Sequence, residues 1–184
     1  MKTVSSENFG LIIAYLLPGF VALWGVSYFS PTVGSWVTAS QQGAPTVAGF
    51  MYVTLASLAA GVTVSAVRWA TIDQLHHATG IRPPAWKFVN LEGKLQGYRT
   101  LIENHYRYYQ FYSNMFVAAA LSFYARVFRE SWASVGLWPT LAFAVLELVL
   151  FAGSRDTLRL CVRTHKSQIM WPSCLCGLQP RFSD

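Results

Sequence analysis

The sequence predicts an all-α integral membrane protein that crosses the bilayer four times. Hydrophobic residues make up 53% of the 184-residue chain and charged residues only 12%, whereas soluble domains carry about 25% charged residues. A bilayer core about 30 Å thick needs about 20 apolar residues in a helix. Four segments approach that length: Phe9–Phe29, Val47–Trp69, Phe111–Phe128 and Ala133–Gly153. We therefore expect residues 1–184 to form a single four-span membrane domain.

The basic residues lie on alternate connections. Residues 30–46 carry no charge, whereas the connection 70–110 and the tail 154–184 are rich in Arg and Lys. Because cationic loops remain cytosolic, both termini and the 70–110 connection are predicted to face the cytosol. The net charge of +6 and pI near 9.4 then reflect topology and contact with anionic lipid headgroups, and no nucleic-acid binding is predicted. The candidate cytosolic-interface or headgroup residues are Arg68, Arg107, Arg155, Arg159, Arg163 and Lys166.

The third span is expected to extend into the cytosol. From Leu91 to Gln110, apolar residues recur at steps of three and four, which is typical of a helix. No proline or glycine separates this stretch from the third span, so one helix from about Leu91 to Phe128 is predicted. The preceding part of the connection, 70–90, is expected to be a loop with a short helix near Asp73–Ala78.

Two aromatic patches carry a family resemblance. These are Tyr15-Leu16-Leu17-Pro18-Gly19-Phe20 near the start and the run from His105 to Tyr112. Both resemble patches in small multi-pass bacterial membrane proteins of uncharacterised function. The resemblance implies a bacterial cytoplasmic (inner) membrane and says nothing about activity.

The second span carries a face of small residues. Gly49, Ser57, Gly61 and Ser65 are separated by multiples of four residues and so share one side of a helix. Small residues at this spacing allow two helix backbones to approach closely in lipid. The pattern predicts a packing or assembly contact, with the partner helix either in this chain or in another copy.

The third and fourth spans are predicted to form an antiparallel hairpin with its polar residues inside. Pairing Asn114 with Glu147 and Ser122 with Thr140 gives a consistent antiparallel register. An ionisable side chain within a span is costly and normally faces a partner or water. Glu147 is therefore either a structural group that fixes helix register or a proton- or ion-linked site.

The remaining candidates for chemistry lie near the cytosolic face. His76, His77 and Glu103 have the right types for an interfacial site, but their spacing matches no established metal motif. No catalytic residue, metal or cofactor is predicted, and bound lipid is expected. Arg155, Arg159 and Arg163 follow one another at four-residue steps, which suits either anionic lipid or an acidic cytosolic partner.

These patterns favour a non-enzymatic membrane subunit that assembles through helix packing, either with itself or within a larger complex. The alternatives are a pore-forming or membrane-perturbing effector, a small channel or transporter that uses Glu147, and a lipid-modifying membrane enzyme. The sequence identifies neither the partner nor the number of copies.

Overall fold

The computed structural model describes residues 6–38, 47–81 and 106–170, and helices account for nearly all of them. This confirms the all-α prediction. Along the chain the helices are α1 (Ser6–Ser27), α2 (Pro31–Thr38), α3 (Val47–Arg68), the π-turn η2 (Trp69–Asp73), α4 (Gln74–Ala78), α6 (Arg107–Glu130), α7 (Trp132–Val135) and α8 (Leu137–Met170). The part of the predicted third helix between Leu91 and residue 105 lies outside the described residues.

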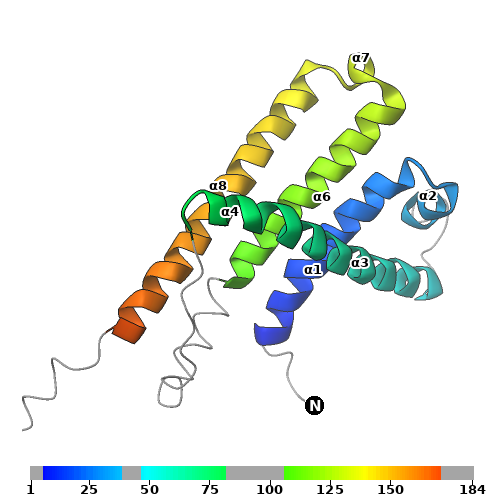
Figure 1. The fold of residues 1–184 in the computed structure, drawn as a ribbon. Helices are drawn as coiled ribbons and strands as arrows, with labels where there is room; N and C mark the ends of the chain where they lie inside the picture. The colour runs from blue at the N-terminus through cyan, green and yellow to red at the C-terminus, as the bar shows by residue number, and fades with distance from the viewer. Residues whose placement is uncertain (1–5, 39–46, 82–105, 171–184) are drawn as a thin grey trace, which may run out of the picture.

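Helices α1, α6 and α8 lie side by side, with α6 in the middle, and α3 to α4 runs obliquely across them (Figure 1). Helix α6 is parallel to α1, because the Asn114 side chain donates to the Ala14 carbonyl and the Ser122 hydroxyl donates to the Val21 carbonyl. Helix α8 runs antiparallel to α6. The Phe123 and Phe143 rings stack at 3.9 Å, and Phe116 lies 6.0 Å from Phe151.

The backbones of α1 and α3 touch where they cross. A Cβ atom added to Gly19 would lie 1.8 Å from the Ser57 carbonyl oxygen, and one added to Gly61 would lie 2.1 Å from the Tyr15 carbonyl oxygen. Only glycine fits at either position. Next to this crossing, Ala22, Val64 and Ala118 from three helices form a small buried cluster. Small side chains therefore set how closely these helices approach.

The helix that contains α3 is longer than predicted. Backbone hydrogen bonding continues from Val47 through η2 to Ala78, although the sequence suggested a loop after Trp69. The helix ends only at Thr79 and Gly80, where Gly80 takes a φ of 91° that L side chains rarely adopt. The predicted short helix near Asp73–Ala78 is thus the end of this longer one.

The hairpin between α6 and α8 turns through two residues with positive φ. Ser131 (φ 71°) ends α6 and Gly136 (φ 77°) separates α7 from α8. Because these residues leave the helical region of φ and ψ, the predicted fourth span does not start at Ala133. Helix α8 starts at Leu137 and continues without a break to Met170.

Two helices among the described residues are long and apolar enough to cross a membrane, namely those covering Val47–Ala78 and Leu137–Arg163. The apolar part of α1, Ile12–Ser27, is shorter. Helix α6 carries polar side chains along its whole length, including Asn114, Ser122 and Arg126. Length and apolar composition therefore identify two candidate spans where the sequence segments suggested four.

The crossing at Gly61 provides a test of the fold. We expect Gly61→Ala to push α1 and α3 apart and to lower the free energy of unfolding by about 1–3 kcal/mol, as overpacking does in closely packed cores. Equilibrium unfolding in mixed micelles would measure the change. Gly34→Ala is the matched control, because its Cβ would lie at 3.5 Å from the nearest atom. Equal stability of the two variants would contradict a backbone contact at Gly61.

Candidate functional site

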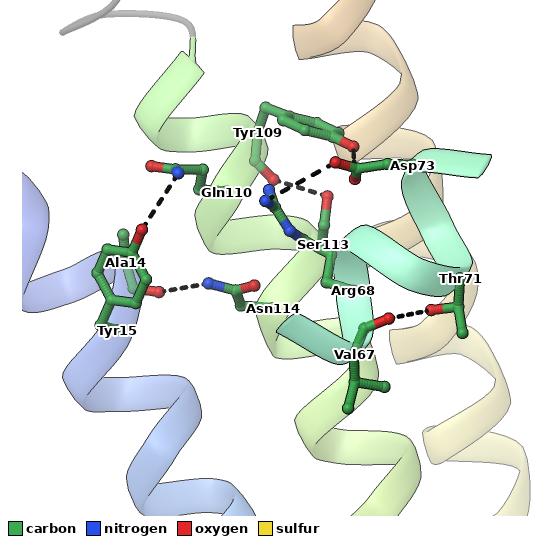
Figure 2. A network of polar contacts seen from close by, with 10 residues as sticks. All are labelled: Ala14, Tyr15, Val67, Arg68, Thr71, Asp73, Tyr109, Gln110, Ser113 and Asn114. Carbon is green, nitrogen blue, oxygen red and sulfur yellow. Dashed lines mark hydrogen bonds and ion pairs between the residues drawn. The ribbon is translucent and has the colours of Figure 1, made fainter. Parts of the chain in front are cut away.

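A buried polar cluster forms where α3 and η2 meet α6. The Tyr109 hydroxyl donates to Asp73 Oδ1 at 2.5 Å, and Arg68 Nη2 lies 3.8 Å from Asp73 Oδ2 (Figure 2). The Arg68 guanidinium carbon also lies 5.3 Å from the centre of the Tyr109 ring, a cation–π distance. Arg68 and Tyr109 are almost fully buried. We call these three residues the arginine cluster.

The π-turn explains how Arg68 and Asp73 come together. In an α-helix, residues five positions apart point about 140° away from each other. The i→i+5 hydrogen bonds of a π-turn place such residues on the same side, and isolated π-turns are often found at functional sites. Because η2 covers Trp69–Asp73, Asp73 is turned back toward Arg68 and the Tyr109 hydroxyl. The wider turn therefore creates the arginine cluster.

The arginine cluster does not satisfy all of its polar atoms. The Nε and Nη1 atoms of Arg68 are buried and have no hydrogen-bond partner among the described residues. Burying a guanidinium without full pairing costs free energy. The contacts of Arg68 with Asp73 and with the Tyr109 ring offset part of that cost.

A second buried pair joins α4 to α8. His76 Nε2 lies 3.1 Å from Ser154 Oγ, and the His76 ring stacks on Phe151 with centroids 5.4 Å apart. This distance also suits a base and its nucleophile. However, Ser154 is 1% exposed and His76 is 0% exposed, and the Ser154 hydroxyl donates to the Phe151 carbonyl at 3.0 Å. The pair therefore forms a contact between helices with His76 Nε2–H as the donor, and His76 Nδ1 has no hydrogen-bond partner among the described residues.

The predicted polar pairs between the third and fourth spans are wrong. Asn114 and Ser122 donate to backbone carbonyls of α1, while Thr140 donates to the carbonyl of Gly136, the residue just before its own helix. The antiparallel hairpin itself is confirmed, but α6 turns its polar stripe toward α1 and a different, aromatic face toward α8. The acceptors are main-chain carbonyls of α1. The side-chain pattern of α8 therefore could not reveal the partners of Asn114 and Ser122.

Glu147 lies on the face of α8 that packs against α6. It falls midway between Phe143 and Phe151, whose partners on α6 are Phe123 and Phe116. This register sets Glu147 level with the alanines near Ala119, which offer no donor. Both Glu147 carboxyl oxygens are accordingly buried without a hydrogen-bond partner among the described residues.

The predicted assembly face of α3 is used within the chain. Ser57 and Gly61 are buried against α1 at the backbone crossing. Gly49 is exposed and Ser65 is half-buried. Ser57 and Gly61 are therefore not available for contact with a second copy.

The predicted headgroup residues divide into two groups. Arg68 is 4% exposed and belongs to the arginine cluster, so its prediction as a lipid-headgroup residue is wrong. Arg107 lies over Gly10 of α1 and Arg155 is half-buried, whereas Arg159 and Arg163 are exposed.

Lys166 lies on α8, with its side chain outside the described part. Glu103 and His105 also lie outside the described residues, and His77 is exposed.

Sequence reasoning missed the arginine cluster, although one signal points to it. The buried face of α3 to α4 runs Ser57, Gly61, Val64, Arg68, Ile72, His76. After Gly61, a charged residue and a histidine occupy positions of an otherwise small or apolar stripe. A continued helical period through residue 76 would have predicted their burial. Within the described residues, no group of three or more His, Cys, Asp or Glu side chains could hold a metal ion.

The chain matches no protein-family model, no curated protein and no solved structure.

The arginine cluster predicts that two variants differ in stability. We expect Asp73→Asn to leave the Arg68 charge buried without its counter-ion and to lower the free energy of unfolding by about 3–5 kcal/mol. The double variant Arg68→Met, Asp73→Asn removes that charge and should unfold at a higher temperature than Asp73→Asn alone. Thermal unfolding in mixed micelles measures both. If the double variant is the less stable of the two, Arg68 has a favourable partner other than Asp73.

Proposed function

We propose that this chain is a non-enzymatic subunit of a bacterial cytoplasmic membrane that crosses the bilayer four times and assembles with itself or with other membrane proteins. The observation that carries the proposal is its exposed apolar surface. Helix α8 packs mainly against α6, and its other side consists of large apolar residues with 46–80% exposure: Leu137, Trp138, Leu141, Val145, Leu146, Leu148 and Val149. Apolar patches of this extent on a folded chain mark contact with lipid or protein.

Helix lengths and directions support four crossings. Helices α1 and α6 contain 22 and 24 residues, which correspond to about 33 and 36 Å and so exceed the core thickness of about 30 Å. Where they cross, α1 and α3 run in opposite senses, because Gly19 lies beside Ser57 while Tyr15 lies beside Gly61. Helix α6 is parallel to α1 and α8 is antiparallel to α6, while α3 crosses these helices obliquely (Figure 1). This alternation of direction supports four crossings.

The basic residues support an orientation with both termini in the cytosol. Arg107 stands at the start of α6, and Arg155, Arg159 and Arg163 stand on the neighbouring part of α8. The opposite end of the hairpin carries Arg126 and Arg129, but Arg126 is paired with Glu130 at 2.8 Å. Among the described residues, more basic side chains thus lie at the end that holds the N-terminus of α1 than at the opposite end of the hairpin.

The buried polar groups favour a structural subunit over an enzyme. Asn114 and Ser122 hold α6 against α1, the arginine cluster holds α3 against α6, and the His76–Ser154 pair holds α4 against α8. Interhelical hydrogen bonds of this kind stabilise helix association in lipid. A catalytic site would need several such groups to converge on space that a substrate can enter.

The same arrangement weakens the channel alternative. A conducting path needs polar residues that face a common lumen. Asn114 and Ser122 face α1, whereas Glu147 faces α6 from the other side. These residues line different helix contacts, so a subunit that packs its polar residues between helices is the better supported function.

The native mass of the gently solubilised full-length protein tests this proposal. We expect a particle larger than one 20.5 kDa chain, made either of several copies or of this chain with other membrane subunits. Native mass spectrometry from nanodiscs would give both the mass and the composition. A single chain that stays monomeric at every protein-to-lipid ratio, with nothing co-purifying, would refute assembly.

A further inference from the structure

The π-turn η2 changes the direction in which every later residue of its helix points. Each residue of an α-helix turns the chain by about 100°, and a π-turn takes one extra residue to complete its turn. Arg68 and His76 are eight positions apart, so in an unbroken α-helix they would point about 80° apart. The extra residue in η2 lowers this angle to about 20°. Both side chains therefore reach the Tyr109 ring, with the Arg68 guanidinium 5.3 Å and the His76 ring 6.0 Å from its centre.

Contacts outside the helix hold the π-turn in place. Asp73 accepts a hydrogen bond from the Tyr109 hydroxyl at 2.5 Å and lies 3.8 Å from Arg68 (Figure 2). If the segment were an α-helix, Asp73 would point about 140° away from Arg68 and both contacts would be lost. Isolated π-turns are rare in helices, and losing the partner of a buried guanidinium is strongly unfavourable. The arginine cluster therefore favours the π-turn over the plain helix.

The same segment carries a second set of residues that can face inward. Without the π-turn, Ile72 would take the place of Asp73 and Leu75 would take the place of His76, since each lies one position earlier. Leu75 is 47% exposed in the structure. Phe151, on which the His76 ring stacks at 5.4 Å, would offer Leu75 an apolar contact. Residues 69–78 thus have two ways to pack against the same neighbours.

We propose that η2 is a register switch. While the arginine cluster is intact, the π-turn keeps His76 against Ser154 of α8. When the cluster breaks, residues 69–78 rewind into an α-helix, so that α4 turns by about 100° and moves by about 1.5 Å. Leu75 then replaces His76 against α8. A change at α6 is thereby transmitted to α8 through an element with two discrete arrangements, which is the physical basis for coupling between distant sites.

The contacts of the Phe151 ring distinguish the two arrangements, and NMR of the full chain in nanodiscs measures them. Wild type should show cross-relaxation between the Phe151 and His76 rings and none with the Leu75 methyl groups. The double variant Arg68→Met, Asp73→Ala removes the cluster without leaving an unpaired buried charge. In that variant the His76 contact should be lost and the Leu75 contact should appear. Persistence of the His76 contact, or loss of both contacts, overturns the switch.

Deletion of Ala70 separates helix register from the contacts of the arginine cluster. Ala70 is exposed within η2. Without it the segment can form a plain α-helix that still points His76 toward α8. In this shortened chain, the double variant should therefore keep the contact between His76 and Phe151. Loss of the contact there would mean that the cluster holds His76 by a route other than register, which overturns the switch.

An exposed ion pair on α6 supplies the matched control. Arg126→Met, Glu130→Ala makes the same change in residue types at a pair that lies far from η2, and the His76 contact should persist. Loss of that contact in the control overturns the switch as well. If the double variant at the cluster does not fold, Tyr109→Phe replaces it, because it removes one of the two contacts of Asp73. The Leu75 contact should then appear beside the His76 contact, and its absence overturns the switch.

Discussion

The backbone contact between α1 and α3 determines where the rest of this molecule is placed. Gly19 and Gly61 leave no room for a Cβ atom, so the two helices can cross closely only there. From that crossing, the continuous helix made of α3, η2 and α4 runs across α6 and reaches α8 (Figure 1). Two of its polar residues then contact successive helices. Arg68 contacts Tyr109 of α6, and His76 contacts Ser154 of α8. Both buried polar contacts thus depend on two glycines some distance away.

The polar interior uses few groups, and each group connects two helices. Close backbone packing and hydrogen bonds hold these helices together. Asn114 and Ser122 bind main-chain carbonyls of α1, which any sequence on α1 would offer. Arg68, Asp73 and Tyr109 depend on the π-turn and on one another. The arginine cluster is therefore more sensitive to substitution than the hydrogen bonds of Asn114 and Ser122.

Much of the architecture could be predicted from the sequence, but the partners of its polar residues could not. The apolar runs predicted helices, and their short connection predicted the antiparallel hairpin of α6 and α8. Helical period alone could not choose which face of α6 meets α8, because α6 has a polar stripe and an aromatic stripe and each packs against another helix. The prediction paired Asn114 with Glu147, whereas the aromatic stripe packs on α8 and leaves Glu147 opposite alanine.

The sequence by itself determined the helical class, the apolar character of the helices and the side of the chain that carries positive charge. These properties follow from composition and from periods of three to four residues, which are local. Tertiary structure decided that Ser57 and Gly61 pack within the chain, that Arg68 is buried instead of facing headgroups, and that a π-turn aligns Asp73 with it. Those outcomes depend on the crossing of helices distant in sequence, and a local pattern carries no record of the angle or register at which two helices meet.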